Sequence, residues 1–509
     1  MNSSLRINLL IYFSLLAAHV ALTWLLPYFP TQDGPCHIYN LLILHDLLHG
    51  GKEFGKFYTY TLHPVPNLGF DLLTYPLINS LPPLAAEKTF ITIYIVLLGM
   101  SLPLLLKTFE RTLFPYSYFV FPVVFNYSLL MGFYSYTITV PLFILAFCLA
   151  WKIRNSSVLC KFVCYNLSGL ILFYFHLIPA VFFLISLISI SLSGTGGYRR
   201  NVRQLLLLFA TILPFALELL IYLSQGSKQP PPDFSYLLSV SRINRLITDL
   251  LSFSTINLSR WQLVPGCLYI SLVVSFVYSP LKEIYLAAKA NKHEVPPPVK
   301  TVLILASLLT IIYLVAPFRI GDGSNFNERL PWVILLVLPP LMRLPHAAIF
   351  QRAGAALVAG CAAGFLLCNA VVLWEESTKI ERYLRGLSAH IPNGAYVMGF
   401  KSKPPDYARV DTLLHAASYY GIFQRCIDIS NYEAGFHYFL VHFKDTIPTL
   451  PPESQIISSP ATIRWVDYPF IQYVLGWEID NKERMELDDF FHVIWREGPL
   501  TVWQRNQQG

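Results

Sequence analysis

The chain has 509 residues, of which 54% are hydrophobic and only 13% charged, and its formal net charge is +7. Soluble domains carry about twice this charged fraction, so the composition excludes a soluble globular protein and indicates a multi-pass membrane protein. Lys and Arg clusters between apolar runs account for the positive charge, and eight scattered cysteines show no metal spacing or disulfide framework. No nucleic-acid partner is predicted.

The first apolar run, 7–26, follows Arg6 and indicates an uncleaved membrane anchor with its N-terminus in the cytoplasm. Directly after it comes the sequence Gln32-Asp33-Gly34-Pro35-Cys36-His37, and apolar residues then recur at helical spacing as far as position 48. This pattern predicts a helix lying along the membrane surface, with Asp33 at its start and close to the lipid head groups. The alternative is that Asp33 only caps this helix.

The segment 30–88 is expected to form a first outer loop. Its apolar patch 67–84 contains Asp71 and several prolines, which favours an interfacial or re-entrant segment over a clean span. Further apolar runs follow, and with the first they predict about eleven transmembrane helices. The runs are 89–106, 114–131, 133–151, 158–174, 176–193, 204–224, 262–281, 300–318, 330–345 and 354–374.

Lys and Arg clusters fall at alternate connections, which places the N-terminus in the cytoplasm and the C-terminal part outside the cytoplasm. This orientation requires 158–193 to be a helical hairpin, with His176 at its outer tip. An aromatic-flanked His at this position is either an interface anchor or a substrate contact. Glu218 lies inside an apolar run, where an ionisable group is either functional or held by a structural hydrogen bond.

The chain divides into a membrane domain, 1–375, and a tail, 376–509, because the charge density rises at Glu375-Glu376. The tail is expected to form a small extracytoplasmic α/β domain. Its predicted strands and helices are 395–400, 438–443, 470–475 and 500–504, and 378–389 and 409–421, respectively.

A short connection ends in Glu328-Arg329 at the start of a late apolar run. Together with the early outer Asp33, the surface helices and the soluble tail, this arrangement resembles the polytopic C-type glycosyltransferases, a superfamily that includes protein O-mannosyltransferases and lipid A aminoarabinose transferases. The likeness in architecture covers residues 1–375. The motif at Gln32–His37 is similar to that of bacterial glycosyltransferase-like membrane proteins, whereas Gly34 replaces the Glu that follows Asp in the mannosyltransferases.

The resemblance implies a bacterial inner-membrane enzyme that moves a sugar from a polyprenyl-phosphate donor to an acceptor hydroxyl, with inversion. Asp33 is then the general base, and Arg329 holds the leaving phosphate. Glu328 orients Arg329 or contacts the sugar, and His37 and His176 are further substrate-binding residues. The alternative for Arg329 is an anchor at the membrane interface. Whether the acceptor is a glycan, a lipid or a protein stays open.

No cofactor is predicted, and no metal site is required. Asp322, Asn325 and Asp33 have oxygen ligands suited to a divalent cation, but no sequence pattern brings them together.

Two other functions remain compatible with the sequence. One is a transporter or flippase for lipid-linked sugars, with Glu218 and His176 lining its path; the other is a non-catalytic glycan-binding scaffold. Phosphate-binding loops and dinucleotide fingerprints are absent from the sequence. In the tail, one group of polar and aromatic residues is expected either to contact the acceptor or to cover the active site: His415, Tyr419, Tyr420, Tyr432 and Glu433.

Overall fold

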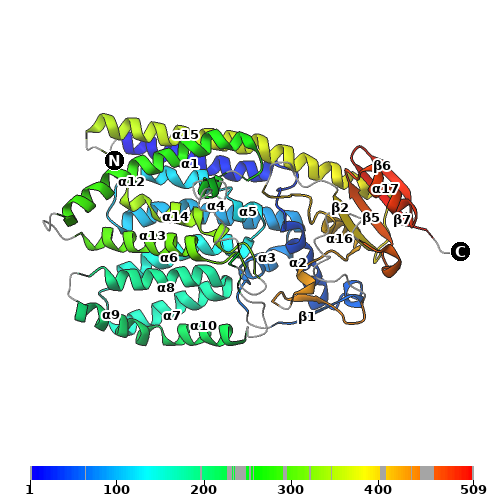
Figure 1. Ribbon diagram of the computed structural model, residues 1–509, viewed down its shortest axis with the longest axis horizontal. Coiled ribbons are helices and arrows are strands. Elements are labelled where there is room, and N and C mark those ends of the chain that lie inside the picture. Colours follow the sequence, from blue (N-terminus) through cyan, green and yellow to red (C-terminus); the bar gives the residue numbers. More distant parts are fainter. Residues whose placement is uncertain are drawn as a thin grey trace.

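The computed structural model describes residues 3–62, 65–194, 198–225, 232, 234–235, 248–251, 254–255, 257–289, 295–319, 323–344, 347–401, 409–436, 438–447 and 463–506. A bundle of apolar helices forms the body of the molecule, with the N-terminus at one end and the tail at the other (Figure 1). Within the described residues, seven helices are long and apolar enough to cross a membrane. They are α1 (Ser3–Leu25), α4 (Pro83–Thr108), α6 (Tyr134–Lys152), α7 (Val158–Phe175), α12 (Leu263–Lys289), α13 (Pro297–Val315) and α15 (Ala348–Leu384).

The expected multi-pass helical architecture is confirmed, but the count of about eleven spans is not. The run 204–224 is bent by 72° between α9 (Tyr198–Thr211) and α10 (Leu213–Gln225), where Pro214 cannot donate a backbone hydrogen bond. The runs 114–131 and 330–345 contain internal prolines and form only short pieces. These pieces are η2 (Tyr116–Val123), α5 (Tyr127–Leu130), α14 (Pro331–Val337) and η5 (Pro339–Leu341).

The predicted hairpin over 158–193 is confirmed. Helix α7 ends at Phe175, helix α8 (Leu177–Leu192) begins two residues later, and the two pack against each other with His176 at the joint. Figure 1 shows this joint at the end of the bundle that faces the tail.

The first outer loop contains the predicted surface helix, α2 (Gly34–Leu48). Pro35 lies in its first turn, where a missing backbone N–H breaks no helical hydrogen bond. The 3-10 helix η1 (Phe54–Lys56) and strand β1 (Tyr58–Tyr60) follow. The patch expected to be interfacial forms the short helix α3 (Gly69–Ile78) before α4 begins at Pro83.

Helix α15 runs without a break from the bundle through position 375 into the tail, where η6 (Arg385–Ala389) follows it. The tail contains a five-stranded sheet in the order β3-β2-β5-β7-β6, in which β2 is parallel to β3 and β5, and β7 is antiparallel to β5 and β6. Its elements are β2 (Tyr396–Lys401), α16 (Ser418–Gln424), β3 (Ile427–Asp428), η7 (Glu433–Gly435), η10 (Trp465–Asp467), β5 (Tyr473–Trp477), α17 (Asn481–Asp488), β6 (Phe491–Glu497) and β7 (Leu500–Arg505).

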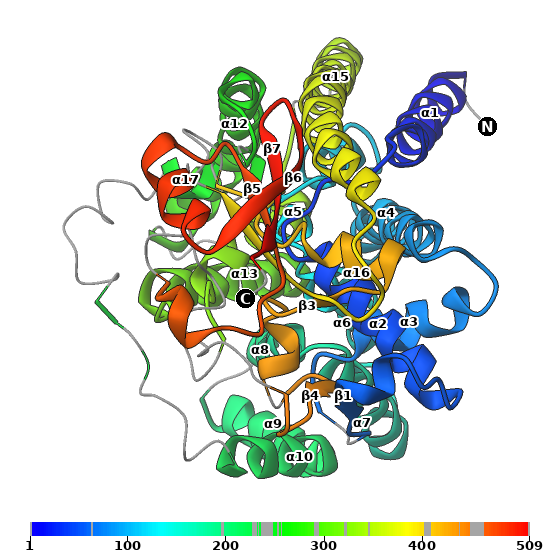
Figure 2. The same ribbon diagram turned by 90° about the vertical axis from the view of Figure 1, so that its right-hand side faces the viewer.

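Three predicted strands of the tail belong to this sheet, but the fourth does not. Strand β4 (Val441–Phe443) pairs antiparallel with β1 of the first outer loop. Helix α16 also packs on α2, with Cys36 Sγ 3.2 Å from Ser418 Oγ. Seen along the long axis, the tail covers the end of the bundle beside α2 and α3 (Figure 2). A domain boundary near 375 stays a prediction, and these contacts favour a tail that folds against the first loop.

The β1–β4 pairing can be tested by cross-linking, because Thr59 lies directly opposite His442 in the register. The Cβ atoms of directly opposed residues are about 4.5–5.5 Å apart, which allows a disulfide after a small adjustment. The double variant Thr59→Cys/His442→Cys is expected to form this disulfide on mild oxidation, detected by mass spectrometry of the non-reduced digest. Each single variant is the control. A double variant that stays fully reduced would contradict the docking of the tail on the first loop.

Candidate functional site

The loop that carries Asp33 is held by backbone hydrogen bonds to the turn between α5 and α6. Gln32 N donates to Leu130 O at 2.9 Å, and Asp33 N donates to Met131 O at 3.1 Å. Backbone pairing of this kind fixes the loop without using the Asp33 side chain. The carboxylate therefore remains available for other contacts.

Gly132 lets the two segments approach this closely. Its φ is +87°, and a Cβ at this position would lie 2.8 Å from Gly34 N and 2.9 Å from Asp33 Cβ. Both the backbone conformation and the space therefore require glycine.

The buried side chain of Glu87, in α4, lies against the loop that carries Asp33. The Tyr134 hydroxyl donates a hydrogen bond to Glu87 Oε1 and lies 3.1 Å from Thr31 Oγ1. A Cβ on Gly34 would come within 2.7 Å of Glu87 Oε1 and 2.5 Å of the Tyr134 hydroxyl. A glutamate at position 34, as in the mannosyltransferases, would not fit without displacing Glu87.

Asp33 occupies the N-cap position of α2, but its side chain makes no capping hydrogen bond. The residue is 7% exposed, and Gln32 Nε2 donates to Asp33 Oδ1 at 3.2 Å. Burial raises the pKa of Asp33 to about 6, although the charge of His37 and hydrogen bonds from Gln32 and Tyr432 favour the ionised form. The Asp33 side chain therefore does not cap α2.

His415 from the tail covers this carboxylate. Its Nε2 lies 3.6 Å from Asp33 Oδ1, which is too long for a hydrogen bond, and its ring packs 4.9 Å from the Tyr432 ring. Burial, reinforced by the charge of His37, lowers the pKa of His415 to about 3. The imidazole is therefore neutral, and the contact is not an ion pair.

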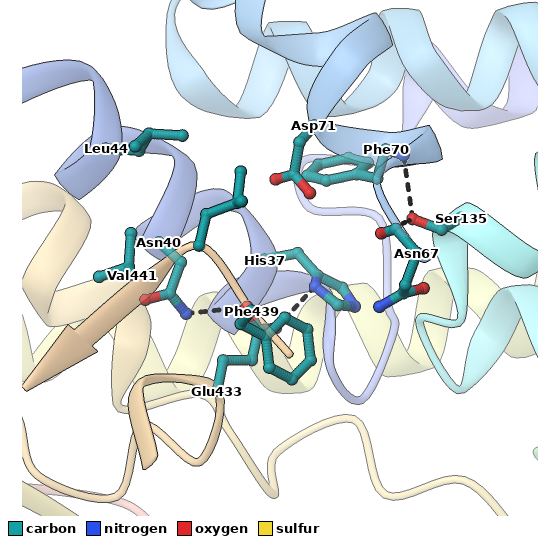
Figure 3. Close-up of a pocket in the computed structure, with 11 residues that line it drawn as sticks. His37, Asn40, Leu44, Asn67, Phe70, Asp71, Ser135, Glu433, Phe439 and Val441 are labelled. Atoms are coloured by element: carbon teal, nitrogen blue, oxygen red, sulfur yellow. Dashed lines mark hydrogen bonds and ion pairs between the residues drawn. The ribbon is translucent and has the colours of Figure 1, made fainter. Parts of the chain in front are cut away.

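A small polar cavity is lined by His37, Asp71 and Glu433 (Figure 3). His37 Nδ1 pairs with Glu433 Oε1 at 2.6 Å, and Asn40 Nδ2 donates to Glu433 Oε2 at 2.9 Å. Burial opposes the charged imidazole, but Glu433 and Asp33 raise the pKa of His37 to about 9, so the imidazole is a cation at neutral pH. Burial and the charge of Glu433 raise the pKa of Asp71, on the opposite wall, to about 7.

Arg329 and His176 form a second cluster. Arg329 lies in η4 (Asn327–Arg329), and its Nη1 is 3.2 Å from His176 Nε2. Arg329 Nη2 donates to Ser324 O at 3.2 Å, and the guanidinium stacks 3.9 Å from the centre of the Phe133 ring. The Tyr136 hydroxyl donates to Arg329 O at 2.7 Å and so fixes the backbone of this residue.

The protonation of His176 follows from its second ring nitrogen. Nδ1 accepts a hydrogen bond from Ile178 N at 3.2 Å as the N-cap of α8, and burial together with the Arg329 charge lowers the pKa of the ring well below its usual value. A neutral ring with an accepting Nδ1 carries its proton on Nε2. Two donors, His176 Nε2–H and Arg329 Nη1–H, therefore face each other, and a bound anion would accept from both.

Further observations on Arg329 fit an anion site. Burial lowers the pKa of this guanidinium, and within the described part of the chain its Nε is buried without a hydrogen-bond partner. Glu328 is held nearby, because its Oε2 accepts from the Tyr127 hydroxyl at 2.9 Å and Asn325 Nδ2 donates to that hydroxyl at 3.2 Å.

The start of α6 separates the two clusters. Phe133 stacks on Arg329, whereas the next residue, Tyr134, packs 5.5 Å from the His37 ring. The Asp33 carboxylate is near enough to Arg329 for its charge to favour the protonated guanidinium. Asp33 therefore interacts electrostatically with both clusters.

The structure thus brings Asp33 and His37 together, and His176 and Arg329 together with Glu328 beside them. Tyr432, Glu433 and His415 of the tail join the first group, whereas the Tyr419 ring packs on Tyr28 and the Tyr420 hydroxyl donates to Tyr383 O. Glu218 accepts a hydrogen bond from Tyr174 at 2.9 Å. Asp322 lies outside the described residues, and no group of three metal-binding side chains occurs among those that are described.

Sequence reasoning gave no role in the site to three residues, Glu87, Asp71 and Gln32. Glu87 lies in α4, and Asp71 lies in the apolar patch of the first loop. An ionisable residue within an apolar segment was the signal available for both. Gln32 was seen only as part of the motif, yet its side chain links Asp33 to the tail through the bond from Asp411 N to Gln32 Oε1 at 3.2 Å.

No protein-family model matches the chain, and no curated protein does. Among solved structures, the crystal structure of ArnT from Cupriavidus metallidurans in the apo state aligns with a TM-score of 0.51 and 10% identity, over 99% of this chain and 98% of that chain. The structure of ArnT from the same organism bound to undecaprenyl phosphate aligns with a TM-score of 0.47 and 9% identity, over 98% and 96% of the two chains. The first match shows that this chain shares the fold of ArnT over nearly its whole length, the tail included.

The buried Asp33 carboxylate is expected to oppose folding at neutral pH. Because its folded pKa of about 6 lies above the ordinary 3.8, the stability linked to its proton is present at low pH and is lost as pH rises through about 6. The free energy of unfolding of Asp33→Asn, relative to that of the parent protein, should therefore increase from pH 4.5 to pH 7.5, by an amount on the order of 2 kcal/mol.

Thermal unfolding in one detergent at both pH values measures this gain. Asp46→Asn is the matched control, because it removes a carboxylate from the other end of α2, where Asp46 lies 3.5 Å from Arg425. Equal shifts for the two variants would contradict the buried state of Asp33.

Proposed function

We propose that this protein is a membrane glycosyltransferase that moves a sugar from a polyprenyl-phosphate donor to an acceptor hydroxyl. The observation that carries the proposal is the Asp33 carboxyl group, which is buried, does not cap its helix and belongs to a residue packed against Gly132, next to the Phe133 ring that stacks on Arg329. The shared fold supports the same class of enzyme.

Asp33 acts as the general base. An acceptor hydroxyl is a poor nucleophile near neutral pH, so its proton must leave as the oxygen attacks the anomeric carbon. A carboxylate whose pKa is raised to about 6 is ionised at neutral pH and is a stronger base than an exposed aspartate. The hydroxyl proton passes to Asp33 while the new carbon–oxygen bond forms.

Arg329 and His176 hold the leaving phosphate. As the bond between the anomeric carbon and the phosphate oxygen breaks, its electron pair stays on that oxygen, and negative charge grows there. The Arg329 guanidinium and the His176 Nε2–H are two donors at this position. Attack from the side opposite the phosphate inverts the anomeric centre.

Glu328 and His37 complete the substrate contacts. Glu328, held by Tyr127, orients Arg329 or accepts hydrogen bonds from sugar hydroxyls. His37, kept cationic by Glu433, stabilises the ionised form of Asp33 and lines the small polar cavity together with Glu433 and Asp71. No cofactor takes part in this scheme.

We place the site on the extracytoplasmic face of a bacterial inner membrane. The alternating Lys and Arg clusters support this orientation, and the N-terminus and the tail lie at opposite ends of the bundle (Figure 1). The membrane domain 1–375 then carries Asp33 and Arg329, and the tail 376–509 closes the site from outside.

Removing the base and removing the phosphate ligand should have different effects. Asp33→Asn is expected to bind a polyprenyl-phosphate sugar but to lower turnover by roughly two to four orders of magnitude. Arg329→Ala should weaken donor binding as well as turnover, and Arg329→Lys should recover only part, because an ammonium lacks the two-pronged geometry. Parental turnover should also fall as pH drops below about 6, where Asp33 takes up its proton.

Two measurements with a panel of labelled polyprenyl-phosphate sugars distinguish these outcomes. One is the binding of the donor, and the other is the loss of its sugar label to an acceptor. The matched controls are Asp46→Asn for the acid and Arg343→Ala, which removes an exposed arginine paired with Glu283, for the guanidinium. All variants must elute as folded protein in the same detergent. Turnover at the parental rate in Asp33→Asn would refute Asp33 as the general base. A parent protein that transfers sugar from no donor of the panel would leave a transporter or a scaffold.

A further inference from the structure

Four aromatic side chains of the tail gather on the segment between the start of η7 and β4. This aromatic cluster consists of Tyr432, Phe436, Tyr438 and Phe439. The ring centres of Phe436 and Tyr438 are 5.4 Å apart, those of Tyr438 and Phe439 are 4.6 Å apart, and those of Tyr432 and Phe439 are 6.0 Å apart. The four rings therefore form one continuous group.

Tight turns and two anchors hold the segment that carries the cluster. Phe436 N donates to Glu433 O at 3.1 Å, and Phe439 N donates to Phe436 O at 3.3 Å, so the chain turns twice within a few residues. At one end Glu433 Oε1 pairs with His37 Nδ1 at 2.6 Å, and at the other end β4 pairs with β1. The rings are therefore fixed against the first outer loop.

On one side the cluster reaches the proposed base. The Tyr432 ring packs 4.9 Å from the His415 ring, and His415 Nε2 lies 3.6 Å from Asp33 Oδ1. The Phe439 ring packs 6.4 Å from the His37 ring, and Figure 3 shows it beside His37 and Glu433.

On the other side the cluster reaches the proposed phosphate ligand. The Tyr438 hydroxyl is close enough to Arg329 to interact with the charge of the guanidinium, which also stacks on Phe133. The cluster thus extends from the base to the guanidinium. In the proposed reaction the anomeric carbon lies between these two groups, so the sugar ring of the donor occupies the space that the cluster borders.

The surface of the cluster matches a sugar ring. Phe436, Tyr438 and Phe439 are all partly exposed, so their ring faces are not used up by the core of the tail. A sugar has C–H groups on its faces, which pack against aromatic rings, and hydroxyl groups on its edge, which bond to the oxygen atoms of tyrosines. A hydrocarbon chain is a poorer match, because the tail lies beyond the apolar helices of the bundle (Figure 1).

We propose that the aromatic cluster of the tail binds the sugar ring of the donor and selects which sugar is transferred. This inference rests on the proposed function and assigns the recognition of the sugar to the tail, whereas the phosphate is held by the membrane domain. The gain in affinity that the sugar gives to a polyprenyl-phosphate donor then arises from contacts with the tail.

The test compares two ligands on the purified full-length protein in one detergent: a labelled polyprenyl-phosphate sugar and the same polyprenyl phosphate without a sugar. Tyr438→Leu and Phe436→Leu remove a ring but keep an apolar side chain, so both should fold. Each should weaken binding of the sugar-bearing ligand roughly tenfold and leave binding of the bare phosphate unchanged. Tyr438→Phe keeps the ring and should retain most of the affinity.

Phe423→Leu is the matched control, because Phe423 is an aromatic residue of the tail that is 45% exposed on α16 and lies outside the cluster. Its affinity for both ligands should equal that of the parent. Equal weakening of the two ligands in Tyr438→Leu and Phe436→Leu, or no weakening at all, would overturn the proposal. So would a parent protein that binds the two ligands equally well.

The binding comparison needs no turnover, so its outcome is separate from that of the proposed function. Asp33→Asn should keep the parental preference for the sugar-bearing ligand while losing transfer. A parent that prefers this ligand but transfers no sugar would refute the proposed transfer and leave the sugar site in place.

Selection of the sugar has a readout of its own. For two donors whose sugars differ at one hydroxyl, Tyr438→Leu should change the ratio of the two kcat/KM values roughly tenfold. An unchanged ratio would contradict a role in selection. A higher KM for the acceptor together with parental donor binding would assign the cluster to the acceptor and overturn the proposal.

Discussion

The site depends on the close approach of two backbone segments, the loop before α2 and the turn before α6. The hydrogen bonds from Gln32 N and Asp33 N to the carbonyls of Leu130 and Met131 fix this approach, and Gly132 provides the room for it. Because the backbone makes these bonds, the Asp33 side chain is not needed to hold its own loop. The same approach buries Asp33 and sets Phe133 and Tyr134 against the two clusters around it.

A carboxylate buried without a direct cationic partner destabilises the folded state of most proteins. Here two parts of the chain supply the groups that surround Asp33. The first loop supplies the charge of His37, and the tail supplies Glu433, Tyr432 and His415. The pair between His37 and Glu433 joins these parts, so the protonation of Asp33 depends on the docked tail. Burial is the main cause of the raised pKa of Asp33, and the first loop alone does not bury this residue; the docked tail is also required.

Local features of the fold were predictable from the sequence, and long-range pairings were not. The surface helix over 34–48 and the break at His176 followed from apolar spacing and from the Lys and Arg clusters, which are local signals. Strand β4 was predicted as a strand, but its partner β1 is about 380 residues away, and no periodicity identifies such a partner. Asp33 and Arg329 were recognised by position, whereas their link through α6 depends on side-chain packing. Glu87 was missed because a carboxylate at the edge of an apolar run is also common at membrane interfaces.

The unbroken helix α15 connects the hydrocarbon layer mechanically to the site. Its 37 residues extend roughly 55 Å, well beyond the ~30 Å of a bilayer core. At its outer end Glu376 accepts from Thr412 Oγ1, on the segment that leads to His415, and Ser377 Oγ accepts from Tyr28 N, on the segment that leads to Asp33. A rod of this kind tilts when the bilayer thins or thickens. A change in lipid composition that alters the bilayer thickness would therefore shift the segment that carries Asp33 relative to the segment that carries His415.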